Sequence, residues 1–179
     1  MSIFLLVASI LMWIASIVSI PSRPLYAPAF SYLGLLGIKF CETNGIPWLP
    51  VNTTMLISWL SITIVVMMAT MLQPMEIRKQ TRGMAYIIGG ALVGLAIGLL
   101  GFTVSNRIGM LYGIMIIAVA AGIFFGFLLY SNTPHGRAIN VRSGEFFRYL
   151  MAKGFPAAVS VMQIGLVLVL LIATRGHGN

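Results

Sequence analysis

The chain has 179 residues, of which 59% are hydrophobic and only 8% are charged, and its formal net charge is +8. Soluble domains contain about 25% charged residues, so this composition excludes an ordinary soluble domain and indicates an integral membrane protein. The acidic residues are limited to Glu42, Glu76 and Glu145, none of which lies within an apolar run. Proton relays and cation sites inside membranes normally use acidic or histidine side chains, so the composition disfavours autonomous ion coupling.

Five apolar runs are long enough to cross a bilayer as helices. A run of roughly 18 to 23 residues covers about 27 to 35 Å at ~1.5 Å per residue, which matches a hydrocarbon core of ~30 Å. Continuous runs also favour helices over the alternating pattern of a membrane barrel. We therefore expect an all-α, polytopic integral membrane protein with a single transmembrane domain. Its five transmembrane helices are expected over residues 3–20, 55–72, 84–104, 108–130 and 156–174.

The first run, residues 3–20, is expected to be a retained helix and not a cleaved signal peptide. Only Met1 and Ser2 precede it, so the basic residues that open a signal peptide are missing. A small-x-small cleavage site before Pro21 is missing as well.

Residues 21–54 form the longest connection between runs, yet many of their side chains are apolar. We expect this segment on the outer side of the membrane, where it lies along the interface, dips into the bilayer as a re-entrant segment, or packs against another protein. The sequence leaves these three possibilities open. The candidate residues for contact with a partner or with lipid are Tyr26, Phe30, Tyr32, Leu36 and Trp48.

The triplet Asn52-Thr53-Thr54 stands immediately before the second run, where a helix needs an N-cap. The same triplet matches a glycosylation sequon, but its closeness to the span favours the cap. After the second run, Gln73-Pro74 ends the helix because proline cannot continue a helix interior.

Small residues recur every fourth position in the third and fourth runs, and such positions share one face of a helix. Without side chains there, two backbones can approach closely. Only Ser105, Asn106 and Arg107 separate the two runs, so we expect a tight, glycine-packed hairpin within one chain. Contact between chains through the same faces is the alternative. The expected helix-packing residues are Gly90, Gly94, Gly98, Ala118, Gly122 and Gly126.

Residues 131–155 contain a short amphipathic stretch in which Phe146, Phe147, Leu150 and Met151 are expected to form one apolar face, with Arg148 among its polar neighbours. It is expected to lead into the fifth run with its cations at the headgroups, and the alternative is that it docks a partner. Within the fifth run, Gln163 is expected to hydrogen-bond to another helix, since an amide buried in lipid needs a partner.

Basic residues predict the orientation of the spans. Seven of the eleven Lys and Arg residues lie in the connections 73–83 and 131–155, which places both connections in the cytoplasm by the positive-inside rule. The N-terminus is then expected in the cytoplasm and the C-terminus outside. The most natural location is a bacterial cytoplasmic membrane.

The residue types needed for chemistry are sparse. One cysteine (Cys41) and two histidines (His135 and His177) do not supply the ligands of a structural metal or haem site. Neither histidine has a carboxylate near it in sequence, and Cys41 and His135 are expected on opposite sides of the membrane, where they cannot pair as nucleophile and base. We therefore expect no catalytic residues, no cofactor, no metal and no nucleic-acid partner.

The leading functional hypothesis is a non-catalytic accessory or scaffold subunit of a larger integral membrane protein complex. Its partners would be other integral membrane subunits, in a homo- or hetero-oligomer, and anionic lipid headgroups, which the basic residues favour. The alternative is a small homo-oligomeric channel or transporter for an anionic or neutral solute, built on hydroxyl groups and backbone dipoles.

Overall fold

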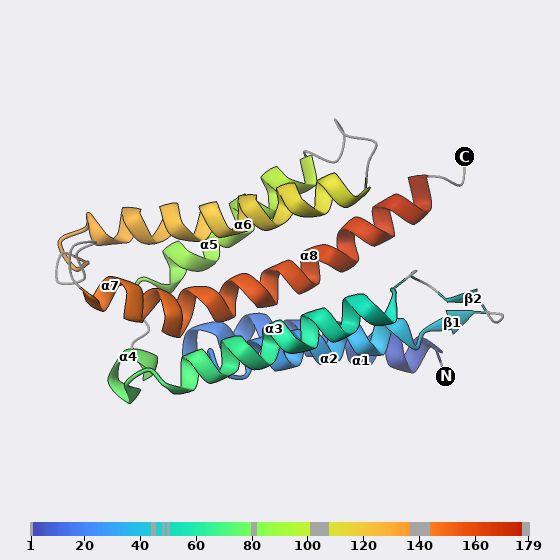
Figure 1. Ribbon diagram of the computed structural model, residues 1–179, viewed down its shortest axis with the longest axis horizontal. Helices are drawn as coiled ribbons and strands as arrows, with labels where there is room; N and C mark the ends of the chain where they lie inside the picture. The colour runs from blue at the N-terminus through green and yellow to red at the C-terminus, as the bar shows by residue number, and fades with distance from the viewer. Residues whose placement is uncertain are drawn as a thin grey trace.

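The computed structural model describes residues 2–43, 46–47, 49, 51–79, 82–100, 108–136 and 144–176, and this part of the chain is mostly helical (Figure 1). Its long helices are α1 (Ser2–Ser22), α2 (Ala27–Lys39), α3 (Thr53–Met71), α5 (Met84–Leu100), α6 (Ile108–Ser131) and α8 (Phe155–Gly176). The shorter elements are α4 (Met75–Lys79), α7 (Gly144–Tyr149) and the π-helical turn η2 (Leu150–Gly154). Two antiparallel strands of two residues each, β1 (Glu42–Thr43) and β2 (Ile46–Pro47), follow α2.

Among the described residues, four helical segments are long and apolar enough to span a membrane: Ile3–Ser22, Thr53–Met71, Gly113–Ser131 and Gly144–Leu171. The chain is therefore helical and carries the features of an integral membrane protein. The third predicted run forms α5, which at 17 residues is shorter than these four segments, and residues 101–104 of that prediction lie outside the described residues. Asn52 caps α3 as predicted, because its side chain accepts a hydrogen bond from the Thr54 backbone N–H at 3.5 Å.

The last span begins earlier than predicted. Helical backbone runs without interruption from α7 through η2 into α8, so residues 144–155 are not a loop. Pro156 lacks the N–H that an α-helix would donate to the preceding turn, and the π-helical turn immediately before it accommodates that loss.

The chain turns back on itself after α1. Pro21 and Pro24 disfavour further helix, and α1 ends at Ser22. In α2, a Cβ at Gly34 would overlap the Trp13 indole and a Cβ at Gly37 would overlap the Ser9 hydroxyl, so these two glycines let α2 pack closely against α1. At 13 residues, α2 is only about 20 Å long, too short to cross a bilayer fully.

This return changes the predicted topology. Figure 1 shows the N-terminus and the C-terminus at the same end of the bundle, with α4 and α7 at the other end. This arrangement does not support the prediction that the termini lie on opposite sides of the membrane, because α2 brings the chain back before α3 begins. The end of α1 lies beside η2, the turn that directly follows α7, since Lys153 Nζ of η2 donates to the Pro21 carbonyl at 3.2 Å. Arg23, predicted on the outer side, thus lies at the end that carries α4.

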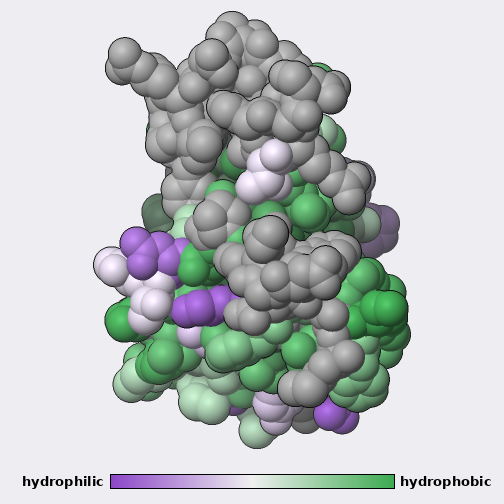
Figure 2. All heavy atoms as spheres, turned by 90° about the vertical axis from the view of Figure 1, so that its right-hand side faces the viewer, coloured by the Kyte–Doolittle hydropathy of each residue, from purple (hydrophilic) through white to green (hydrophobic). Residues whose placement is uncertain are grey.

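The central helix of the bundle is α8, which lies between the α5–α6 pair and the group of α1, α2 and α3 (Figure 1). In its apolar window 72% of the residues are buried, against 17% for α1. Figure 2 looks onto the end that carries both termini, and hydrophobic residues cover most of the described surface around the bundle in that view. This is the surface expected of a protein surrounded by lipid.

Candidate functional site

Helices α5 and α6 approach each other so closely that their backbones are in contact. A Cβ at Gly90 would overlap the Gly122 carbonyl oxygen, and a Cβ at Gly122 would overlap that of Gly90. A Cβ at Gly94 would stand 2.8 Å from the Val119 Cα. The structure thus brings the predicted small residues together within one chain, including the remaining members of the set, Gly98, Ala118 and Gly126. The connection over residues 101–107 lies outside the described residues.

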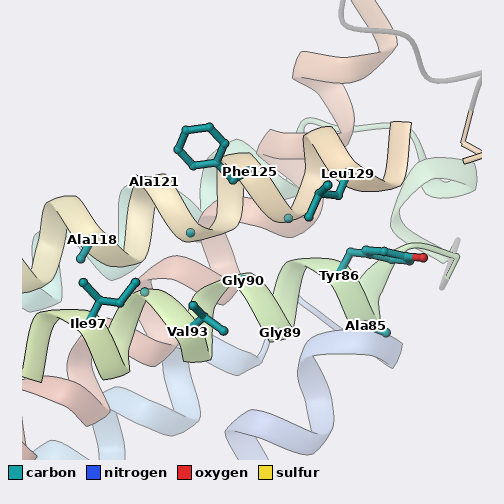
Figure 3. A pocket seen from close by; sticks show the side chains of 13 residues that line it. Ala85, Tyr86, Gly89, Gly90, Val93, Ile97, Ala118, Ala121, Phe125 and Leu129 are labelled. Atoms are coloured by element: carbon teal, nitrogen blue, oxygen red, sulfur yellow. The ribbon is translucent and has the colours of Figure 1, made fainter. Parts of the chain in front are cut away.

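An apolar groove runs along the outer side of this helix pair (Figure 3). Its volume is about 570 Å³, and it extends from Ala85 to Ile97 on α5 and from Ala118 to Leu129 on α6. This length along α5 corresponds to about 18 Å of helix. The groove exists because glycines replace side chains on its floor. A Cβ at Gly89 would meet no atom within 4 Å, so the space in front of that residue is open.

A second, more polar pocket of about 460 Å³ lies at the α4–α7 end of the same helix pair, and Tyr86 lines both spaces. Figure 3 shows the Tyr86 side chain extending beyond the end of the groove. The polar pocket is lined by Arg82, Gly83, Tyr86, Tyr130, Thr133 and His135. Tyr86 therefore lies between the apolar groove and a neighbouring pocket that Arg82 lines.

Tyr130 forms one wall of the polar pocket. Its ring packs on Gly83, whose φ of +84° favours glycine and whose added Cβ would stand 2.6 Å from the ring. The side chain is only 4% exposed, and within the part of the chain that the structure describes its hydroxyl has no hydrogen-bond partner. Buried hydroxyls normally have one. The neighbouring Tyr149 differs, because its hydroxyl donates to the Arg82 carbonyl.

Gln163 lies at the centre of the bundle and is fully buried. Its Nε2 donates to Thr63 Oγ1 of α3 at 2.8 Å, and its Oε1 accepts a hydrogen bond from Ser31 Oγ of α2. The interhelical role predicted for this residue is thus observed as a contact among three helices. The partners themselves could not be identified from the sequence, because the sequence did not predict that α2 packs against α1 and α8 of the same chain.

The predicted contact residues of the first connection do not form one exposed surface. Tyr26 is exposed and Phe30 and Leu36 are half-buried, whereas Tyr32 is buried and its hydroxyl donates to the Leu56 carbonyl at 3.3 Å. Trp48 lies outside the described residues. The apolar side chains of α2 are instead explained in large part by packing inside the bundle.

Phe146, Phe147 and Arg148 are also separated by the fold. Phe146 is fully buried, with its ring centroid 4.4 Å from that of Phe127, whereas Phe147 and Arg148 are exposed. Consecutive helical residues point about 100° apart, so the predicted shared apolar face of Phe146 and Phe147 does not form. Tyr149 stacks on Phe127 with centroids 5.0 Å apart.

The polar pocket was missed from the sequence, although its residues flank two neighbouring runs. Arg82-Gly83 comes just before α5 and Thr133-Pro134-His135 just after α6. In an antiparallel pair, the start of one helix lies beside the end of the next, and this is the signal that could have found the pocket.

Comparison of the chain with protein-family models, curated proteins and solved structures found no match. Among the described residues, no group of three or more His, Cys, Asp or Glu side chains is placed to hold a metal ion.

Proposed function

We propose that this chain is a non-catalytic accessory or scaffold subunit of a larger integral membrane protein complex. The observation that carries the proposal is an exposed seam of large apolar side chains along α1. We define the α1 seam as Phe4, Val7, Leu11, Ile14 and Val18, all of which are exposed.

The spacing of the α1 seam is that of a helix-packing surface. Its members alternate by three and four residues, as the a and d positions of a coiled coil do. Most transmembrane helix pairs cross with similar left-handed geometry. Leu11 is 59% and Val18 66% exposed, so a helix of a neighbouring subunit could reach the whole seam without rearrangement of the bundle.

The rest of the molecule suits a rigid scaffold. In this proposal α5 is a fifth spanning helix and forms a glycine-packed hairpin with α6, while α8 ties the hairpin to the other helices. The short α2, together with the residues that lead to α3, makes a sixth crossing, so that both termini lie on one side. The location we propose is a bacterial cytoplasmic membrane with α4 and α7 on the inner side and both termini outside. Arg23, Arg78, Arg82 and Arg148 all belong to that inner end, which supports this orientation by the positive-inside rule.

Purification of the tagged chain in a mild detergent, followed by mass spectrometry of co-purifying chains, tests the proposal. The double variant Leu11→Ala/Ile14→Ala removes two large apolar side chains from the α1 seam. Ile64→Ala/Val65→Ala is the matched control, since it removes exposed apolar side chains of α3 instead. We expect one or more membrane proteins to be lost selectively from the α1 variant. A chain that purifies alone in every mild detergent would contradict the proposal.

A further inference from the structure

We propose that the groove of α5 and α6, together with the polar pocket at its end, binds one membrane phospholipid with a net negative charge. An acyl chain lies in the groove and the phosphate headgroup lies in the pocket. This site is separate from the α1 seam and goes beyond the proposed function.

The dimensions of the groove suit an acyl chain. It follows α5 from Ala85 to Ile97, about 18 Å. One leaflet of a bilayer has about 15 Å of hydrocarbon, half of the ~30 Å core. The groove therefore begins at the α4–α7 end of the helices and covers about one leaflet. A partner helix that crosses the membrane would need a contact surface about twice as long.

The surface of the groove is also suited to an acyl chain. Glycine and alanine form much of its floor, and the open space at Gly89 exposes backbone that no other side chain covers. Phe125 and Leu129 line the same groove from α6. A flexible hydrocarbon chain can follow such a surface and gain dispersion contacts along it.

The pocket at the end of the groove has the chemistry of a phosphate site. Arg82 supplies a guanidinium group, which matches the oxygens of a phosphate in geometry and charge. His135 adds ring nitrogens from the opposite side of the helix pair. Tyr130 lines the same pocket, and its hydroxyl is buried and unpaired among the described residues, so a phosphate oxygen would become its acceptor only if the ring shifts toward the pocket.

The position of the pocket agrees with an anionic lipid of the inner leaflet. It lies where Arg82 precedes α5, beside the α4–α7 end that carries most of the basic residues. In the proposed orientation this end meets the leaflet in which basic side chains attract anionic headgroups. Because Tyr86 lines both spaces, the groove and the pocket are neighbours, and a lipid whose chain lies in the groove would have its headgroup beside the pocket.

Native mass spectrometry of the full chain tests the site. The protein in detergent is equilibrated with equal amounts of palmitoyl-oleoyl phosphatidylglycerol and palmitoyl-oleoyl phosphatidylcholine, which share their chains and differ in headgroup charge. We expect one phosphatidylglycerol to be retained in preference to phosphatidylcholine. Arg82→Gln should lower that preference about fivefold, the effect of one basic side chain near a headgroup.

A pair of glycine variants tests whether the lipid binds in the groove or elsewhere on the surface of the helix pair. Gly89→Leu fills the groove, whereas Gly113→Leu adds the same side chain at another open position of the helix pair that does not line it. Both should fold, because an added Cβ meets no atom within 4 Å at either site. Only Gly89→Leu should lower lipid retention. Tyr130→Phe should lower the preference for phosphatidylglycerol without loss of thermal stability.

Several results would overturn the proposal. Equal retention of the two lipids by the wild type would exclude headgroup recognition. Equal lipid retention by the two glycine variants would exclude the groove as the binding site of the acyl chain. Displacement of phosphatidylglycerol by inorganic phosphate would indicate a phosphate pocket without a lipid chain. Loss of a co-purifying protein in Gly89→Leu, with lipid retention unchanged, would assign the groove to a partner helix.

Discussion

Gly90 and Gly122 face each other so closely across α5 and α6 that a Cβ on either would overlap the backbone carbonyl oxygen of the other. The contact between the two helices is therefore made by backbone atoms. In lipid, where hydrophobic association is weak, such close packing is a main source of attraction between helices. The groove on the outer side of the pair is a consequence of the same missing side chains.

Substitution at this contact should be severe. Gly122→Leu and Gly94→Leu would each place a side chain where the facing backbone lies, so we expect a loss of at least about 3 kcal/mol in stability, more than ordinary core overpacking costs. Thermal unfolding in a mild detergent measures the effect. Gly113→Leu is the control, since its Cβ meets open space, and its midpoint should stay close to that of the wild type. Equal midpoints for all three variants would disprove the close contact.

Gln163→Leu should destabilise the bundle by about 1 to 2 kcal/mol, because two interhelical hydrogen bonds are lost. The loss is limited because both partners keep a local acceptor: Thr63 donates to the Trp59 carbonyl at 2.7 Å and Ser31 to the Pro28 carbonyl at 3.1 Å. The same unfolding experiment checks this.

Ser61→Ala is the matched control for Gln163→Leu. It removes an exposed hydroxyl that bonds only within its own helix, to the Ile57 carbonyl, so it should be silent. A silent Gln163→Leu would show that the central amide does not hold the three helices together.

Two tyrosines with different surroundings give a further test. Tyr149→Phe removes a hydroxyl that donates to the Arg82 carbonyl, and should cost about 1 kcal/mol. Tyr130→Phe removes a buried hydroxyl that is unpaired among the described residues, and should leave stability unchanged or raise it. In lipid-free detergent, the thermal midpoint of Tyr149→Phe should therefore be lower than that of Tyr130→Phe. The reverse order would contradict the hydrogen bonding described for this end of the bundle.

The common side of the two termini can be tested by cysteine labelling in intact membrane vesicles. In a Cys41→Ser background, Ser2→Cys and Thr174→Cys should react with a membrane-impermeant maleimide from one side, and Glu76→Cys from the other. Labelling of Ser2→Cys and Thr174→Cys from opposite sides would restore the topology expected from the sequence and exclude the return of α2.

Cys41 itself should react slowly in the wild type. Its thiol is buried and donates to the Gly37 carbonyl at 3.4 Å, and burial raises its pKa. A raised pKa lowers the fraction of reactive thiolate at neutral pH. Its labelling rate should therefore fall well below that of Glu76→Cys at the same pH. Equal rates would contradict the buried position.

Hydropathy was sufficient to predict the helical membrane class, because the length of an apolar run is tied directly to bilayer thickness. The N-cap at Asn52 and close helix packing at Gly90, Gly94 and Gly98 could also be predicted, since caps and close helix packing depend on local residue type. The start of the last span could not be predicted, because the π-helical turn before Pro156 allows a helix to continue where proline normally marks a boundary.

The place of α2 could not be predicted for a different reason. Its apolar side chains suit lipid, an interface or the protein interior equally well, and only contacts with distant residues decide among them. Gly34 against Trp13 and Ser31 with Gln163 are such contacts. The polar pocket was missed likewise, since Arg82 and His135 are far apart in the sequence and meet only through the antiparallel pairing of α5 and α6.

Site-specific photo-crosslinking in native membranes tests the proposed accessory role most directly. A photoreactive amino acid is placed at Leu11 in the α1 seam or, as a control, at Ile64 on the exposed face of α3. If the chain is a subunit held through α1, position 11 should give a discrete adduct with another membrane protein and position 64 should not. Adducts with lipid alone at both positions would contradict the account.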